Sequence, residues 1–222
     1  MVNGKQKVIS RSGKTGLSPG SLIHIGKKKA EKVKIHVIDY TENEMTENDL
    51  KKIEESFAFK NMSSVTWINI DGLHETEVMK KIGEYYGVHA LFLEDILNTD
   101  QRPKIEIFDE YILLIFKMLS FDGKNKKIYS EQISIILGKD FVLSFQEKEG
   151  DLFDPIRERI RNSGGRVRKM GADYLAYLLF DITVDNYFHI LEEIGVKLED
   201  IEEKLISGAR GDFLKDIYHL KR

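Results

Sequence analysis

Apolar and polar residues follow two different periods in the first hundred residues of the chain. Apolar side chains alternate with polar ones in residues 33–40, which is typical of a half-buried strand, and the β-branched and aromatic stretch 63–70 predicts a second strand. Residues 46–57 begin with Thr-Glu-Asn-Asp, which resembles a capping box and predicts a helix. Apolar residues at helical spacing predict two more helices, over 78–86 and 90–97.

The pattern changes after the polar loop 98–103. Three strand-like stretches between residues 104 and 147, separated by Asp-Gly-Lys-Asn and Gly-Lys-Asp turns, predict an antiparallel meander of about four strands. A helix over 151–162 and a helix of more than 25 residues over 172–203 follow, and a further helix is expected after the 208–211 loop. This order predicts an α/β fold in which one mixed, partly antiparallel sheet lies between helices on both faces.

Composition excludes several classes of protein. The 222 residues include no cysteine, so disulfides, thiolate nucleophiles and cysteine-ligated metal sites are all absent, and an intracellular protein is expected. The longest apolar run has seven residues, Tyr174 to Phe180, whereas a membrane span needs about 20. The six histidines form no metal-binding pair and there is no Gly-x-Ser-x-Gly motif, so we expect no enzyme.

Charge is unevenly distributed along the chain. The net charge is −3, yet residues 1–34 carry nine Lys and Arg against one acid. Such a basic arm is typical of a solvated tail, and the alternative is an arm that binds nucleic acid or anionic lipid. No aromatic or recognition-helix pattern supports nucleic-acid binding, so no nucleic-acid partner is expected.

Five carboxylates of the long helix fall within an arc of about 40° when residues are placed at 100° intervals. Only two cations occur in this part of the helix, so pairing within the helix cannot neutralise them. The stripe is interpreted as a solvated acidic face, a site for hard divalent cations, or a surface for a basic partner. It consists of Asp181, Asp185, Glu192, Glu199 and Glu203.

Four segments resemble the cytoplasmic domain of the CorA family of magnesium and cobalt transport channels, in the same order and with similar spacing. They include TWINIDGL, LEDILNTDQRPKIEIF and ADYLAYLLFDITVDNYF, and the resemblance extends roughly from Val33 to Arg222. The segments are residues 66–73, 93–119, 131–161 and 172–194.

The resemblance implies a role in ion transport. Proteins of this family are homopentamers, in which an α/β/α domain is followed by long helices leading into a stalk helix and then by two membrane helices. It implies that this chain is a Mg²⁺-sensing regulatory domain at the cytoplasmic face of the cell membrane, with Co²⁺ as a possible second ion. The implied division is a basic arm (1–32), a sensor domain (33–206) and the start of the stalk helix (207–222).

The resemblance also implies which residues bind the regulatory ion. Asp95 matches a carboxylate that binds a divalent ion between neighbouring subunits, Glu94 lies beside it, and Asp181 matches a helix carboxylate at a second inter-subunit ion. The alternative is a free-standing soluble module that uses the same scaffold, with its basic arm engaging nucleic acid or anionic lipid.

Overall fold

A computed structural model of the chain describes residues 15–60, 62–122 and 127–207. The chain forms two compact units, of which the larger contains most of the sheet and the smaller contains most of the longest helix. The larger unit consists of Met1–Met118 and Ser130–Phe180, and the smaller unit consists of Leu119–Tyr129 and Asp181–Arg222.

Seven strands form one sheet in the order β2-β1-β3-β7-β6-β5-β4. β3 and β7 run parallel, whereas β1 is antiparallel to both β2 and β3, β6 is antiparallel to β7, and β4 is antiparallel to β5. The mixed sheet and the four-strand meander at its end are therefore confirmed. The strands are β1 (Lys34–Tyr40), β2 (Met45–Leu50), β3 (Val65–Asp71), β4 (Lys104–Ile107), β5 (Ile112–Asp122), β6 (Lys127–Leu137) and β7 (Phe141–Gln146).

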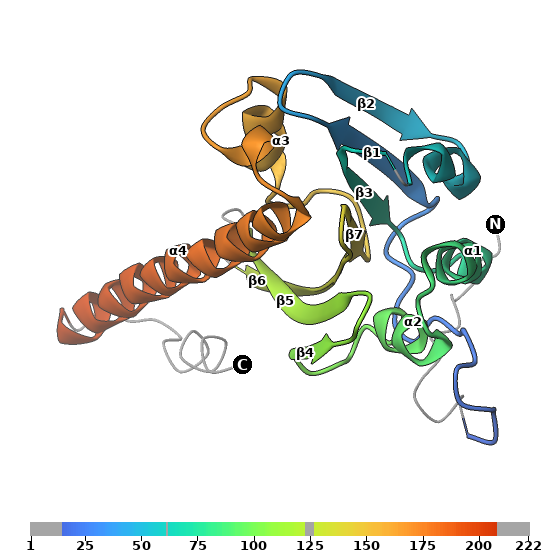
Figure 1. Cartoon of the computed structure of the whole chain (residues 1–222). Helices are drawn as coiled ribbons and strands as arrows, with labels where there is room; N and C mark the ends of the chain where they lie inside the picture. The colour runs from blue at the N-terminus through green and yellow to red at the C-terminus, as the bar shows by residue number, and fades with distance from the viewer. Residues whose placement is uncertain (1–14, 61, 123–126, 208–222) are drawn as a thin grey trace, which may run out of the picture. The chain divides into compact units, whose positions relative to one another are not determined.

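Helices cover both faces of the sheet, as predicted. Figure 1 shows α1 (Thr76–Tyr86) and α2 (Ala90–Leu97) on one side and α3 (Asp154–Arg161) on the other. α1 ends at Gly87, whose left-handed φ of 73° suits glycine because it has no Cβ. A short 3₁₀ helix, η3 (Val167–Lys169), precedes the long α4 (Ala172–Ile206).

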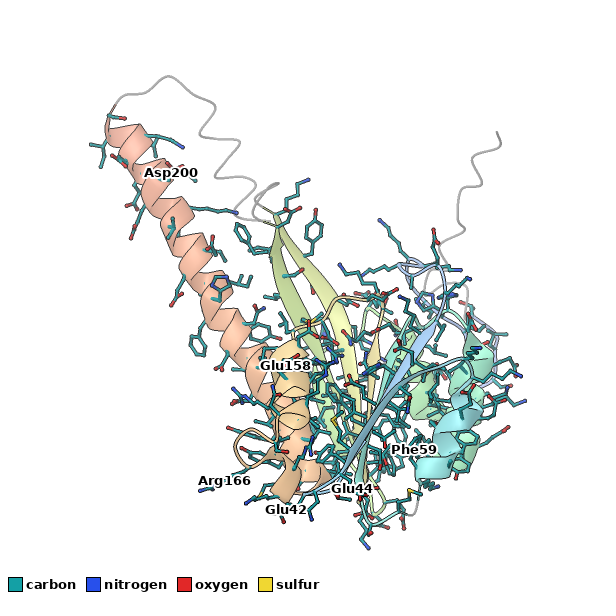
Figure 2. The ribbon with its side chains drawn as sticks, turned by 90° about the horizontal axis from the view of Figure 1, so that it is seen from above. Glu42, Glu44, Phe59, Glu158, Arg166 and Asp200 are labelled. Carbon is teal, nitrogen blue, oxygen red and sulfur yellow. The ribbon has the colours of Figure 1, made fainter. Side chains whose placement is uncertain are left out.

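The predicted helix over 46–57 is wrong. Residues 45–50 form β2, which pairs with β1 through a turn in which the Thr41 hydroxyl accepts hydrogen bonds from the backbone N–H groups of Asn43 and Glu44. Figure 2 marks Glu42 and Glu44 in this turn. Only the 3₁₀ helix η2 (Ile53–Phe59) follows. The free edge of β1 outweighed the local capping signal, because an added strand satisfies the backbone groups of both segments.

The main core lies between the sheet and the α1–α2 side. Strand residues that alternate along β1, β3 and β7 point into it, as the period of a strand requires. The apolar faces of α1 and α2 close the core from outside. Its fully buried members include Val37, Ile68, Ile70, Leu143, Phe145, Ile82, Ile96 and Leu97.

The opposite face of the sheet carries a buried polar network beneath α3. The indole N–H of Trp67 donates to the Ser144 hydroxyl at 2.9 Å, and that hydroxyl donates to the Asn69 side-chain oxygen at 2.6 Å. Gln146 donates to the same Asn69 oxygen and to Asp151, both at 2.9 Å. A buried network of this kind favours one arrangement of the sheet, because in another arrangement its polar groups would be buried without hydrogen-bond partners.

Within the smaller unit, α4 contacts the end of β5. The Asn186 side-chain amide donates to the Leu119 carbonyl at 2.6 Å, and the Lys197 ammonium lies 4.5 Å from the Phe121 ring centre. The long helix over 172–203 is confirmed. The expected helix after 208–211 lies outside the described residues.

Residues 15–32 of the basic arm are attached to the larger unit rather than solvated throughout. Ile25 is 4% exposed, and its N–H donates to the Leu97 carbonyl at 2.9 Å while its own carbonyl accepts from Thr99 N–H at 3.2 Å. The Lys29 ammonium pairs with the buried Glu147 at 2.9 Å. The expectation of a solvated tail is therefore wrong for this part, and residues 1–14 lie outside the described ranges.

Candidate metal-binding site

α2 positions two of the three carboxylates that the sequence singles out. The helix begins after His89, whose Nδ1 accepts the Leu91 N–H at 3.3 Å, and its apolar face is buried in the core. Because the core fixes that face, Glu94 and Asp95 are held half-buried at the rim of the larger unit. Adjacent helical residues diverge by about 100°, so the two carboxylates meet different neighbours.

Asp95 shares a lysine with a second carboxylate. The Lys104 ammonium donates to Asp95 Oδ2 at 2.6 Å and to Glu106 Oε1 at 2.5 Å, and the Gln101 side-chain amide donates to Asp95 Oδ1. The three charged side chains are 25–33% exposed. We call Asp95, Lys104 and Glu106 the Lys104 triad, which has a net charge of −1 when all three groups are ionised.

Short-range sequence and a buried glutamine together build the triad. Lys104 and Glu106 are two residues apart on β4 and therefore share one face of the strand. The loop that joins α2 to β4 is held by Gln132, which accepts the Gln101 N–H at 3.2 Å and donates to the Ile96 carbonyl at 3.2 Å. Gln132 thus joins the loop to α2 through a backbone group of each.

Lys104 keeps its positive charge beside these two carboxylates. Burial lowers the pKa of Lys104, but its hydrogen bonds with Asp95 and Glu106 outweigh burial, so the pKa lies above its usual value. The ammonium therefore remains charged at neutral pH. Neither Lys104 nor Glu106 was selected by sequence reasoning, although the alternation of charged and apolar residues in Lys-Ile-Glu-Ile was a usable signal.

Glu94 contacts the N-terminal segment instead of the triad. Its Oε2 accepts the backbone N–H of Gly20 at 2.7 Å. Gly20 has a φ of 82°, and a Cβ at this position would lie 3.1 Å from that of Ala90. Glycine therefore permits the close approach of the segment to the start of α2.

Asp181 lies on α4 in the smaller unit, whereas Glu94 and Asp95 belong to the larger unit. Four other carboxylates of the acidic stripe are exposed, namely Asp185, Glu192, Glu199 and Glu203. Among the described residues, no cation forms an ion pair with any of the five stripe carboxylates. Asp181 itself is half-buried, so four of the five stripe carboxylates face solvent.

The donor chemistry at Asp95 suits a hard cation. Two carboxylates already converge on one ammonium, and carboxylate oxygens are the ligands that Mg²⁺ prefers. Within residues 15–60, 62–122 and 127–207, no group of three or more acidic or histidine side chains is arranged to hold a metal ion. A divalent ion at Asp95 would therefore complete its coordination with water or with ligands from elsewhere.

A second cluster of charged groups lies at the end of β3. Asp71 lines a cavity of about 300 Å³ together with Lys34, Asp151 and Arg157. Burial raises the pKa of Asp71 to about 7, repulsion from Asp151 acts in the same direction, and the hydrogen bond from Asn69 opposes both. Asp71 is thus a carboxyl group that is half protonated near neutral pH.

This raised pKa predicts a pH-dependent stability. Between pH 3.8 and about 7 the folded chain holds a proton on Asp71 that the unfolded chain releases, so the free energy of unfolding falls as the pH rises through this window. Asp71→Asn removes the effect. As the pH rises from 5 to 8, the free energy of unfolding of the variant should increase relative to that of the wild-type chain. The expected increase is on the order of 1–2 kcal/mol, after allowance for solvent screening.

Urea unfolding at the two pH values measures this difference, with the exposed Asp109→Asn as control. A stability difference between Asp71→Asn and the wild-type chain that is the same at pH 5 and pH 8 would contradict the prediction.

None of the helices in the described ranges combines the length and the apolar character that a membrane span requires.

The fold resembles the soluble domain of CorA from Methanocaldococcus jannaschii, with a TM-score of 0.61 and 19% identity over 83% of this chain and 70% of that one. It also resembles the full-length CmaX protein, with a TM-score of 0.64 and 13% identity over 83% of this chain and 55% of that one. These two likenesses confirm the fold.

Sequence comparison identifies relatives that are transporters. The cobalt/magnesium transport protein CorA of Thermotoga maritima is 44% identical over 211 residues, which are 95% of this chain and 60% of that protein. The magnesium transporter ALR2 of Saccharomyces cerevisiae is 28% identical over 163 residues, 70% of this chain and 18% of that protein. The chain thus spans less than two thirds of the length of either relative. The model of the CorA-like Mg²⁺ transporter family matches residues 62–222, most of the chain, and the chain therefore belongs to this family.

Proposed function

We propose that this chain is the Mg²⁺-sensing regulatory region of a pentameric divalent-cation channel that transports Mg²⁺ or Co²⁺. In this proposal the channel spans the cell membrane through helices beyond the chain, and the region lies on the cytoplasmic side. Residues 1–32 are the arm, 33–206 the sensor domain and 207–222 the start of the stalk helix. The region itself catalyses no reaction.

One observation supports the proposal beyond family membership: Asp95 and Glu106 both bind a positive group, the Lys104 ammonium, at the rim of the larger unit. Glu94 is adjacent on α2, and Asp181 begins the acidic stripe of α4. Mg²⁺ keeps several waters and uses one or two carboxylates. This agrees with the described residues, which nowhere bring three or more potential ligands together.

The proposed regulation follows from charge. Acidic faces of neighbouring copies repel one another, and a divalent ion shared between them favours the arrangement in which they are close. Its loss shifts the population toward looser, open arrangements. Asp95 and Glu94 would hold one such ion and Asp181 a second, and each ion supplies only its charge.

Asp95→Ala in the full-length protein tests the proposal. Removing the carboxylate is expected to raise the Mg²⁺ concentration needed for half-closure by about tenfold, a typical size for coupling between two sites. Ion flux into proteoliposomes, measured as a function of Mg²⁺ on the cytoplasmic side, gives this concentration.

Asp109→Ala, which removes an exposed carboxylate outside the triad, is the matched control and should leave the Mg²⁺ dependence unchanged. If Asp95→Ala also leaves it unchanged, Asp95 is not a regulatory ligand.

A further inference from the structure

Lys104 occupies the position of a cation at the carboxylate where the proposed function places a divalent ion. Its ammonium lies 2.6 Å from Asp95 Oδ2 and 2.5 Å from Glu106 Oε1. The second Asp95 oxygen accepts a hydrogen bond from Gln101. Both oxygens of Asp95 are therefore engaged within one copy of the chain, and one of them is engaged by a positive charge.

We propose that Lys104 is a tethered competing cation that sets the affinity of Asp95 for divalent ions. A divalent ion that binds Asp95 displaces the ammonium, which is covalently attached and hence always present at high local concentration. The site then fills only when the divalent ion is abundant. This inference rests on the proposed function, because it requires Asp95 to be a ligand.

The surroundings of Lys104 make such an exchange feasible. The Lys104 side chain is 27% exposed, so a displaced Lys104 can move its charge into water while its stem stays against the protein. Glu106 is 33% exposed and can keep the displaced ammonium as its partner. A fully buried ion pair would instead leave an unpaired charge in the interior, at a cost that an ion from solution could not readily offset.

The triad also protects the site when no divalent ion is bound. Without Lys104, Asp95 and Glu106 would be two carboxylates near one another with no cation between them, and like charges so placed disfavour the ionised state of both. Lys104 lowers that repulsion in the metal-free chain. Its removal therefore raises the free energy of the metal-free form and leaves more to be gained by binding a divalent ion.

Binding of Mn²⁺ to the whole chain, followed by electron paramagnetic resonance of the free ion, tests the inference. Mn²⁺ is a suitable probe because it shares the preference of Mg²⁺ for carboxylate and water ligands. Lys104→Met keeps the aliphatic stem and removes the charge, and it is expected to bind Mn²⁺ about tenfold more tightly than the wild-type chain, the lower end of the effect of a neighbouring opposite charge on a carboxylate.

Two control variants separate charge from packing. Lys104→Arg keeps the positive charge and should retain wild-type affinity. Lys34→Met removes a different lysine, one that pairs with Glu149 at 2.6 Å, and should also leave the affinity unchanged. Thermal unfolding without metal checks that each variant is folded.

The Asp95→Ala substitution, made alone and with Lys104→Met, distinguishes failure of the inference from failure of the proposed function. If Asp95→Ala weakens Mn²⁺ binding while Lys104→Met does not tighten it, the inference is overturned and the proposed function stands. If Asp95→Ala leaves Mn²⁺ binding unchanged in both backgrounds, the inference and the assignment of Asp95 as a ligand in the proposed function are both overturned. Equal affinities of the wild-type chain and Lys104→Met, including no measurable binding by either, also overturn the inference.

Discussion

Arg157→Met is expected to lower the free energy of unfolding by about 3–5 kcal/mol, because it leaves a buried carboxylate without its partner. The two guanidinium NH groups of Arg157 donate to the two oxygens of Asp151 at 2.7 and 2.6 Å. The Asp151 side chain is 5% exposed, and the guanidinium also lies 5.0 Å from the centre of the Trp67 ring. Methionine fills part of the volume but neutralises nothing.

The loss should depend on pH in a defined direction. Burial raises the pKa of Asp151, but hydrogen bonds from Arg157 and other donors outweigh it, so the pKa lies below its usual value. A carboxylate with a lowered pKa in the folded chain contributes stability above the unfolded pKa and loses it as the pH falls. The difference between Arg157→Met and the wild-type chain should thus be largest at neutral pH and shrink below about pH 4.

Urea unfolding measures both quantities. Arg159→Met makes the same chemical change on the same helix at an exposed position, and we expect it to cost less than about 0.5 kcal/mol. Equal losses for the two variants would show that the Asp151–Arg157 pair contributes nothing particular to stability. Figure 2 labels Glu158, an exposed residue of α3 that pairs with Arg161 at 2.6 Å.

Ile68→Ala is the second change with a large expected effect. Ile68 lies on β3 in the middle of the sheet, is fully buried and points into the main core. Truncation removes buried methyl groups and leaves a cavity that the surrounding strands can only partly close, so we expect a loss of about 2–5 kcal/mol.

Ile107→Ala is the matched control, because the same atoms are removed from a strand residue that is 72% exposed. It should change the free energy of unfolding of the chain by no more than about 0.5 kcal/mol. Thermal or urea unfolding measures the stability of both variants. Comparable losses of stability at the two positions would contradict the assignment of the core.

Local patterns predicted most elements because each element satisfied its own periodicity. β1 has alternating apolar residues, β3 is rich in β-branched and aromatic residues, α1 ends just before Gly87, and α4 is as long as its helical pattern suggested. β2 was missed because its sequence is polar and carries a capping signal. Only pairing with β1, which is not visible in a local window, makes it a strand.

The candidate site was predictable only in part. Glu94, Asp95 and Asp181 were selected by resemblance to a family, and their role as metal ligands remains a prediction. The partners of Asp95 were not selected, because Lys104 and Glu106 resemble any charged residues on a strand until the loop brings them to α2. Likewise, Asp71 looks like an ordinary turn aspartate, and only burial beside Asp151 raises its pKa.

The sequence by itself determined the family, the α/β/α class and the order of most elements, since these depend on periodicity and on matched segments that are read along the chain. The tertiary structure alone decided which charges meet. Gly20 reaches Glu94 and Lys104 reaches Asp95 because the N-terminal segment and β4 both lie against α2. Ion pairs and hydrogen bonds form only between groups that lie a few ångströms apart in space, and separation along the sequence does not determine that distance.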